Sequence, residues 1–394
     1  MLHLAQDLQA LGWTVDVLAP HGETGTAAEE WMDGVRVRRF HYLWPQRSQT
    51  VCYHGGALGN LKAQPLNFLK LPMLVFCQWF NIVKLIRSEG YDAIHSHWIL
   101  PQGFTGAIAS RLFGIPHVVT VHGGDVFALQ GKVLSAFKRF SLDRSDAITV
   151  NSSVTAAAVT RLVASHSKVS TVPMGVSVQA ATKSNPRVKA LRAELCPANG
   201  TLLAFVGRLV DEKGVEDYLR AIALLRNSIP AVKALIIGEG QERGRFECLA
   251  RELSLQDITV FTGWVESEEV STYLAAADVF LGPSRRGSDG WIEAQGLTFI
   301  EAMINRTPVV ATRVGGIVDS VENEVTGLLV DERAPEQLAA AVKRLVDDPH
   351  LTARLVERAR AKAVARFSRE SSARSFSCLF ESIVSDNDAG WSSQ

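Results

Sequence analysis

The sequence of 394 residues is short of cysteine, has no net charge and contains no uninterrupted apolar run long enough to cross a membrane. Its five cysteines are scattered, odd in number and at least 25 residues apart. This argues against a disulfide framework and a zinc site, and favours a reducing cytoplasm. Because 41 basic residues balance 41 acidic ones, no global field draws the protein to nucleic acid. Its length and composition indicate a globular protein of two domains.

The most apolar stretch, residues 66–86, is interrupted by Lys70, Pro72 and other polar residues, and the first residues of the chain lack the apolar core of a signal peptide. Together with Lys84 and Arg87, this stretch suits peripheral docking on an anionic bilayer. The alternative is an ordinary helix whose apolar face packs on a sheet. The sequence leaves both interpretations open, and we expect a cytoplasmic protein, either free or at the inner face of the cytoplasmic membrane.

Short β-branched runs alternate with segments of helical length almost throughout, which is typical of doubly wound parallel sheets in the α/β class. The expected strands are residues 14–18, 93–97, 117–121, 147–150 and 169–172, and then 202–206, 234–237, 258–261, 279–281, 309–311 and 327–330. Residues 173–200 are rich in Pro, Gly, Ser, Asn and Lys, and indicate a linker. We therefore expect two α/β domains, 1–180 and 181–370, which face each other across a cleft. A C-terminal helix and tail follow at 371–394.

The strongest site candidates of the C-terminal half follow directly after expected strands. Gly207 allows a tight turn. The Arg208 guanidinium can donate two parallel hydrogen bonds to a diphosphate, and the Lys213 ammonium can place a compact positive charge beside it. The alternative is a loop arginine and a solvated lysine. Since the carboxyl ends of parallel strands share one edge of the sheet, Gly238 and Val265 are expected at the same edge. Backbone groups near Val265 are expected to contact the base of a nucleotide.

Glu293 and Glu301 lie on either side of an expected helix start at Gly296. Free backbone N–H groups at a helix start favour an anion, phosphate above all. Two carboxylates beside an anion site suit a ligand that has both hydroxyls and phosphates, such as a nucleotide sugar. In the preceding loop, 284–290, Arg285 and Arg286 are expected either to touch an acidic sugar or phosphate or to stay solvated.

In the N-terminal half, His122 and Asp125 flank a glycine pair after the strand 117–121, and this position favours a functional role over a cap. His95 and His97 alternate along a strand and therefore share one face. A metal site would need a third ligand that the sequence does not place. We expect a structural or acceptor-side role for His97 and simple packing for His95.

These motifs, in order along residues 1–365, resemble the retaining glycosyltransferases of family 4. The resemblance implies the GT-B architecture of two Rossmann-like domains. It also implies a hexosyltransferase that moves a sugar from a nucleotide-sugar donor to a glycan or lipid-linked acceptor, in cell-envelope or exopolysaccharide biosynthesis. Retention of the anomeric configuration is implied, with no metal and no cofactor. Front-side attack is the usual mechanism of the family, and Glu293 as a covalent nucleophile is the alternative.

Matching positions carry the roles of the family to this sequence. Arg208 and Lys213 would bind the donor diphosphate and offset charge on the leaving group. Glu293 would bind sugar hydroxyls, and His122 would contact the donor sugar. The remaining donor-binding residues would be Glu301 at the ribose, Asp125 as an orienting group, Gly207, Gly238 and Val265, and the backbone N–H groups of Gly296, Leu297 and Thr298.

The chain departs from the family pattern at its start. A domain of this kind opens with a strand and a glycine-rich loop, whereas Met1 leads directly into an amphipathic helix that contains Leu4 and Leu8. About 15–25 residues, the size of a strand plus a loop, are therefore expected to be missing. This departure supports a second interpretation, a nucleotide-sugar-binding protein without turnover. A third is a GT-B-like nucleotide-sugar epimerase, which the Glu293–Glu301 spacing argues against.

Overall fold

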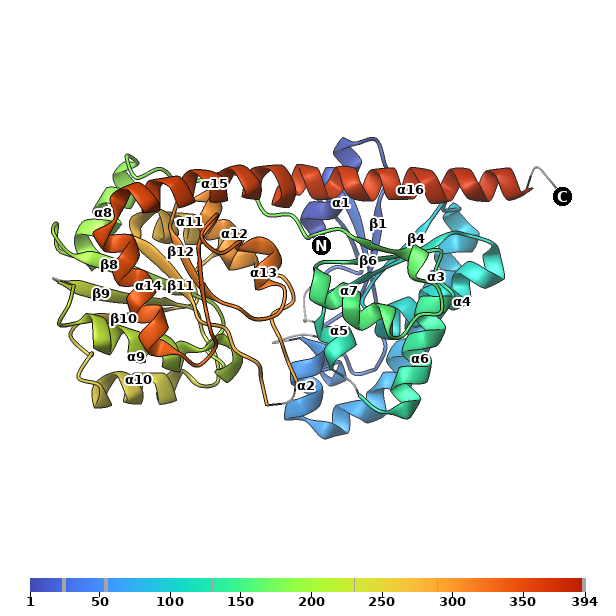
Figure 1. Cartoon of the computed structure of the whole chain (residues 1–394). Helices are drawn as coiled ribbons and strands as arrows, with labels where there is room; N and C mark the ends of the chain where they lie inside the picture. Colours follow the sequence, from blue (N-terminus) through green and yellow to red (C-terminus); the bar gives the residue numbers. More distant parts are fainter. Residues whose placement is uncertain (23–25, 53–55, 129, 230, 289, 392–394) are drawn as a thin grey trace. The chain divides into compact units, whose positions relative to one another are not determined.

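The computed structural model describes residues 1–22, 26–52, 56–128, 130–229, 231–288 and 290–391. The chain folds into two compact units (Figure 1). Unit 1 consists of Met1–Val150, Ala156–Val172 and Ser372–Gln394, and unit 2 of Asn151–Thr155 and Pro173–Ser371. Each unit is described below by itself.

Unit 2 contains one parallel sheet of six strands in the order β10-β9-β8-β11-β12-β13. The strands are β8 Thr201–Val206, β9 Val232–Ile237, β10 Thr259–Gly263, β11 Val279–Gly282, β12 Val309–Thr312 and β13 Leu328–Val330. All six were expected, and their bounds differ from the expected ones by at most two residues. The chain runs outward in one direction from β8 and in the other from β11, so the topological switch point lies between these two strands.

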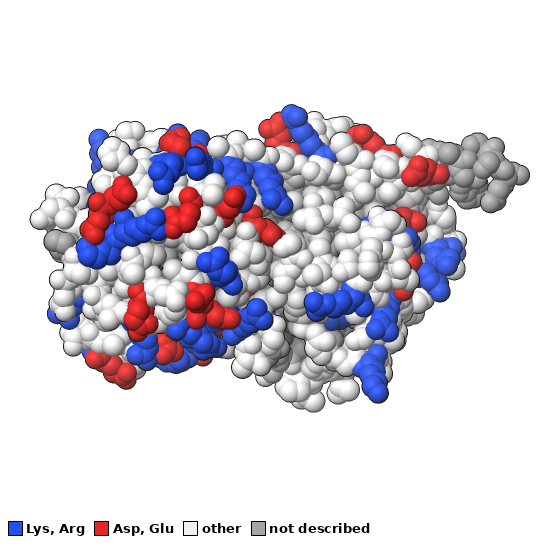
Figure 2. Space-filling model, viewed as in Figure 1, with Lys and Arg blue, Asp and Glu red and all other residues white. Residues whose placement is uncertain are grey.

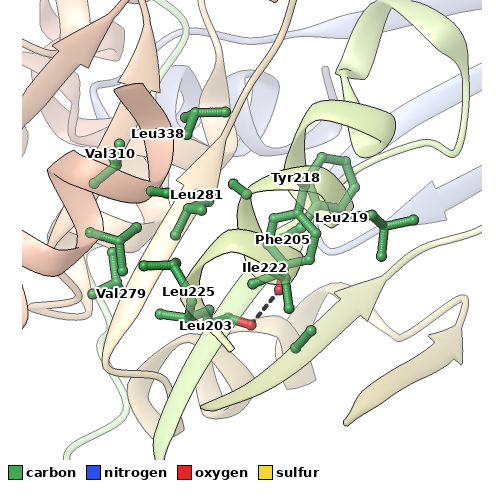
Figure 3. Close-up of a cluster of buried hydrophobic side chains, with 14 of the residues drawn as sticks. Leu203, Phe205, Tyr218, Leu219, Ile222, Leu225, Val279, Leu281, Val310 and Leu338 are labelled. Atoms are coloured by element: carbon green, nitrogen blue, oxygen red, sulfur yellow. Dashed lines mark hydrogen bonds between the residues drawn. The ribbon is translucent and has the colours of Figure 1, made fainter. Parts of the chain in front are cut away.

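Helices cover both faces of this sheet. They are α8 Pro186–Leu195, α9 Val215–Leu225, α10 Arg243–Glu252, α11 Ser267–Ala276, α12 Leu297–Ile304, α13 Ile317–Ser320, α14 Pro335–Asp347 and α15 Pro349–Phe367, with a short η5 at Asp211–Lys213. On one face, α9 and α14 pack over Leu203 and Phe205, and the hydroxyl of Tyr218 donates to the Leu203 carbonyl at 2.6 Å (Figure 3). On the other face, Phe299 of α12 meets Phe280 edge to face at 5.4 Å. A strand buried on both faces explains the continuous apolar runs in the sequence.

Unit 1 contains two sheets. The first is parallel in the order β4-β5-β6-β7, with β4 Ile94–His97, β5 His117–Val121, β6 Ala147–Val150 and β7 Val169–Thr171, all as expected within one residue. In the second, β1 Asp16–Pro20 pairs in parallel with β3 Val35–Phe40, and β2 Glu29–Met32 pairs antiparallel with β3. Within the described residues no strand joins the sheets, and β1 and β4 each lie at the end of one.

The helices of unit 1 are α1 Leu2–Ala10, α2 Ala57–Ala63, α3 Leu71–Glu89, α4 Phe104–Phe113, α5 Gly124–Phe127 and α6 Lys132–Asp143, with short turns η1 Gln46–Ser48, η2 Pro65–Lys70, η3 Ile99–Gly103 and η4 His166–Lys168. Helix α7, Ser153–Thr160, has residues in both units. The last helix, α16 Arg369–Trp391, returns to unit 1. There Trp13 Nε1 donates to Ser377 Oγ at 2.9 Å, and Phe380 packs against Trp13 and His95. The end of the expected tail, 392–394, lies outside the described residues.

Candidate active site

Loops at the carboxyl edge of the unit 2 sheet bring together two of the residues that the sequence singled out. Lys213 follows β8 and Glu293 follows the neighbouring strand β11, and the Lys213 Nζ forms an ion pair with Glu293 Oε2 across the switch point. The same ammonium lies 5.3 Å from the centre of the Trp291 ring. Arg208, also after β8, is exposed and makes no side-chain hydrogen bond or ion pair with the described part of the chain. After β8, the cation Arg208, unpaired among the described residues, is therefore followed in the sequence by Lys213, which is paired with a carboxylate.

The loop that carries Glu293 rests on the glycine turn after β12. Gly316 N donates to the Glu293 carbonyl at 2.8 Å. A Cβ atom on Gly315, whose φ is +57°, would lie 2.1 Å from that carbonyl oxygen. Only glycine fits here, because both the left-handed backbone and the close approach exclude a side chain. Gly315 and Gly316 are not among the predicted site residues, although the sequence places this glycine-rich turn at the same edge of the sheet.

Helix α12 begins beside Glu293, as expected. Gly296 precedes it in the left-handed conformation, and no side chain caps the helix start, so the N–H groups of Leu297 and Thr298 have no intrahelical partner. Glu301 lies one turn inside the helix. Burial raises the pKa of its carboxyl group, and the carboxyl makes no hydrogen bond or ion pair within the described residues. A half-buried acceptor without a partner among the described residues suits a ligand hydroxyl.

Close packing between loops explains two of the predicted donor-binding glycines. A Cβ atom on Gly238, with φ at +134°, would lie 2.1 Å from the Gly207 carbonyl oxygen. The Gly207 N–H donates to the carbonyl of Ile237 at 3.0 Å. Beyond β10, Val265 is half-buried beside the exposed Trp264. Contact of Gly207, Gly238 and Val265 with a donor stays a prediction.

Arg285 is a correction to the sequence analysis. It is only 4% exposed, so it is not solvated. Its guanidinium forms ion pairs with Asp211 and Asp217, and its Nε donates to the Asp211 carbonyl at 3.0 Å. These acids already neutralise it, and contact of Arg285 with an acidic sugar or phosphate stays a prediction. Arg286 is exposed and lies 3.4 Å from Glu332, and Asp289 of the same loop is outside the described residues.

In unit 1, Asp125 ties two loops together. Its side chain is buried, Oδ1 accepts the N–H of His122 at 3.1 Å, and Oδ2 accepts the N–H of Ile99 at 3.0 Å. Burial raises the pKa of Asp125 to about 6, although these hydrogen bonds and the nearby Lys138 favour its charged form. The structure thus gives Asp125 the task of holding the backbone at His122, and direct contact with a donor stays a prediction.

A row of histidines leads to His122. His97 Nδ1 lies 3.0 Å from His122 Nε2, and the rings of His95 and His97 lie 4.1 Å apart, which confirms that these two share one face. Burial lowers the pKa of His95 to about 3 and that of His122 to about 4, and the amino terminus adds to the effect at His122. Burial also lowers the pKa of His97 well below its usual value. All three rings are therefore neutral at pH 7 and act through hydrogen bonds.

Within the described ranges, no group of three or more His, Cys, Asp or Glu side chains is placed to hold a metal ion. The five cysteines are free thiols.

Comparison with known proteins decides the family. Residues 1–175 match the glycosyl transferase 4-like domain, and residues 189–362 match the glycosyl transferases group 1 family. The 2-deoxystreptamine glucosyltransferase of Streptomyces kanamyceticus is 32% identical over 68% of this chain and 71% of its own length. The chain belongs to the group 1 glycosyltransferases. A D-inositol 3-phosphate glycosyltransferase of Corynebacterium urealyticum is 31% identical to this glycosyltransferase over 98% of the present chain and 90% of its own.

Solved structures show the fold of this glycosyltransferase. The sucrose-phosphate synthase of Thermosynechococcus elongatus superposes with a TM-score of 0.80 at 26% identity, over 97% of this chain and 92% of that one. Anabaena HepE superposes with a TM-score of 0.73 at 20% identity, over 94% of this chain and 100% of that one. These likenesses confirm the expected GT-B fold of two Rossmann-like domains.

The carboxyl edge of unit 2 presents two kinds of chemical group. Arg208, Lys213 and the first N–H groups of α12 supply positive charge and donors for an anion. Glu293 and Glu301 supply acceptors for hydroxyl groups. In the absence of a ligand, Lys213 and Glu293 satisfy each other.

Proposed function

We propose that the protein is a retaining hexosyltransferase. It moves a sugar from a nucleotide-sugar donor to a hydroxyl group of a glycan or lipid-linked acceptor in cell-envelope or exopolysaccharide biosynthesis. The observation that carries the proposal is the Lys213–Glu293 ion pair at the β8/β11 switch point, next to Arg208 and the start of α12. One edge of one sheet thus offers cations for a diphosphate and carboxylates for hydroxyls.

Two similar proteins support the donor and the pathway. HepE has been solved with UDP-glucose, and it shares the fold of this chain. A Bacillus subtilis protein described as a putative teichuronic acid biosynthesis glycosyltransferase, TuaC, is 31% identical over 64% of this chain and 61% of its own. Teichuronic acid synthesis supports an envelope polymer as the destination of the sugar. The donor panel described below would identify the nucleobase and the sugar of the donor.

Each residue has a role in the proposed reaction. Arg208 and Lys213 bind the diphosphate and stabilise the charge that grows on it as its bond to the sugar C1 breaks. Glu293 then accepts hydrogen bonds from sugar hydroxyls, while Glu301 holds the ribose. The acceptor oxygen attacks C1 on the face that the phosphate leaves, and a phosphate oxygen takes the acceptor proton. The neutral ring of His122 contacts the sugar, and Asp125 holds His122 in place.

Protein cations take the place of a metal ion in this scheme. Arg208 and Lys213 lie after the same strand and carry two positive charges to the diphosphate. We propose that the reaction needs neither a divalent metal nor another cofactor, and that it takes place in the cytoplasm.

A donor panel tests the proposal. The protein is incubated with nucleotide sugars of different bases and sugars, with and without simple glycoside acceptors, and release of the nucleoside diphosphate is measured. We expect turnover of one donor, an unchanged rate in the presence of EDTA, and a product whose anomeric proton coupling in NMR matches the donor's configuration.

Each of these results has a contrary outcome. Tight binding of one donor without turnover, across all acceptors, would identify a binding protein instead. Inversion at C1 would refute retention, and loss of the rate in EDTA would refute metal independence. Conversion of the donor sugar to its epimer would identify the epimerase alternative.

A further inference from the structure

Unit 1 carries an apolar surface that its own core does not use. It is formed by η2 and the 19-residue helix α3 (Figure 1). Leu69, Met73, Phe76 and Phe80 recur at intervals of four, three and four residues, so they form one stripe along the helix. Their side chains are between 47% and 79% exposed. We refer to these four residues as the α3 stripe.

The opposite face of α3 already packs in the fold. Leu74 and Gln78, four residues apart, are buried there, and Leu74 packs in a small cluster with Phe40, Tyr42 and Val51. Val83, three residues after Phe80, is also buried, so the exposed stripe ends at Phe80. Helix α3 also contacts α4 and the strands β1 and β3. The alternative considered from the sequence, an apolar face that packs on the sheet, therefore accounts for Leu74 and leaves the α3 stripe unexplained. A continuous exposed apolar surface of this kind marks an interaction site.

Charge indicates which kind of partner this surface meets. The stripe is followed by Lys84 and Arg87, four and seven residues after Phe80. The 55 residues from Gly34 to Ser88 contain eight Lys and Arg and no Asp or Glu, in a chain whose total charge is zero. Lys84 is exposed and forms no ion pair within the described residues, and the Arg87 guanidinium lies 5.7 Å above the Phe113 ring.

We propose that the α3 stripe docks the protein on an anionic lipid surface. Phe76 and Phe80 would enter the boundary between headgroups and acyl chains, with Lys84 and Arg87 at the anionic headgroups. A second copy of this chain fits less well, because pairing two such faces would bring like charges together. Segment Pro65–Glu89 is long and apolar enough to cross a membrane by length and composition alone, and in the fold its helix α3 contacts β1, β3 and α4.

This inference rests on the proposed function in one respect, the lipid-linked acceptor. It brings the protein to the surface where a lipid-linked acceptor lies, and vesicle binding does not require transfer activity. The failure of one proposal is therefore distinguishable from the failure of the other.

Vesicle flotation tests the proposal. The full chain is mixed with vesicles of phosphatidylcholine alone or of phosphatidylcholine with phosphatidylglycerol, and the bound fraction is measured against lipid concentration and salt. We expect the anionic vesicles to bind at least roughly tenfold tighter, and salt to weaken the binding. Lys84→Ala with Arg87→Ala should remove most of this preference, since each charge near the surface contributes about a fivefold factor.

The apolar part is tested by Phe76→Ser with Phe80→Ser, which should weaken binding by at least roughly tenfold. The matched control is Val133→Ser with Leu224→Ser, two exposed apolar residues outside the stripe, 68% and 48% exposed, and it should bind like the wild type. Thermal unfolding confirms that each variant is folded. If the phenylalanine pair fails to fold, Leu69→Ser with Met73→Ser replaces it.

Three outcomes would overturn the proposal. The first is no binding to anionic vesicles, and the second is equal loss of binding in the control. The third is a dimer in sedimentation equilibrium that Phe76→Ser with Phe80→Ser dissociates, because the stripe would then be an interface between two copies of this chain.

Discussion

The two units place polar groups at their sheet edges in different ways. Unit 2 pairs opposite charges, and charged side chains of both signs crowd its visible face, whereas wide areas of unit 1 carry none (Figure 2). Nine of the ten histidines belong to unit 1, and only His350 belongs to unit 2. Burial lowers the pKa of His95, His117 and His122, which favours their neutral forms. The sheet edge of unit 2 thus presents paired charges, while that of unit 1 presents uncharged hydrogen-bonding groups.

The largest expected effects separate the units by stability. Phe205→Ala removes a buried ring from the unit 2 core (Figure 3), and should cost about 3–5 kcal/mol of unfolding free energy. Ile148→Ala, at a fully buried position of unit 1, should cost about 2–5 kcal/mol. Hydrogen exchange measured peptide by peptide should show lost protection in the substituted unit alone. Equal loss in both units for either variant would show that they unfold together.

Turnover should depend on the cations of unit 2. Lys213→Ala and Arg208→Ala should each lower kcat by two or more orders of magnitude, if each cation stabilises the leaving diphosphate by about 3 kcal/mol. Lys343→Ala provides the control, because this lysine pairs with Asp347 on the exposed side of α14. Steady-state kinetics with the preferred donor measures the effect. Wild-type kcat in both Lys213→Ala and Arg208→Ala would refute their assigned role.

Acid should unfold unit 1 before unit 2. Burial lowers the pKa values of His95 and His117 to about 3 and that of His122 to about 4. Their neutral forms stabilise the fold above the unfolded pKa of about 6.5, and this contribution is lost as the pH falls through the folded values. Between the unfolded and the folded pKa, each of these histidines lowers the free energy of unfolding by up to about 1.4 kcal/mol for each unit that the pH falls. Asp125, whose pKa is raised to about 6, stabilises the folded state as the pH falls. This is the effect of one group, and the opposite effect comes from several histidines.

Hydrogen exchange between pH 7 and pH 4 measures this difference. Peptides of β4 and β5 should lose protection first, while those of β8 and β9 keep theirs. Simultaneous loss in both units, or earlier loss in unit 2, would contradict the assignment of acid sensitivity to the buried histidines.

The smallest expected effect concerns His97, which positions the ring of His122 from 3.0 Å. His97→Ala should lower kcat/KM by up to about tenfold, the equivalent of one neutral hydrogen bond. The loss should fall in kcat, with little change in KM for the donor. His97→Asn keeps a hydrogen-bonding group and should restore part of the rate. A purely structural role would instead lower the melting temperature and leave kcat of the folded fraction unchanged.

The two units also differ in how well their strands could be predicted from the sequence. The unit 2 strands were found because a parallel strand buried on both faces is a continuous apolar run that ends at a glycine or a charge. In unit 1 the hairpin β2–β3 was missed, although Asp33 and Gly34 are a strong turn signal and the residues after them alternate. Asp33 and Gly34 have φ of +48° and +88°. The signal was present and was not used.

Side-chain partners were beyond the sequence analysis. The positions of Lys213 and Glu293 after their strands were predicted, but their ion pair joins residues 80 apart in the chain. Arg285 reaches Asp217, 68 positions away. Only the packed sheet brings such residues together, so a loop arginine in the sequence gave no sign that it would be buried.

Under the proposed function, the Lys213–Glu293 ion pair described above would make binding of the two ends of a donor cooperative. A diphosphate that draws Lys213 away leaves Glu293 without its counter-ion, and sugar hydroxyls then restore hydrogen bonds to that carboxylate. A free sugar meets an acceptor that is already occupied, and a nucleoside diphosphate alone leaves the carboxylate uncompensated. Under the proposed function, the complete donor is therefore favoured over the sum of its parts, and the departing diphosphate alone is held less tightly.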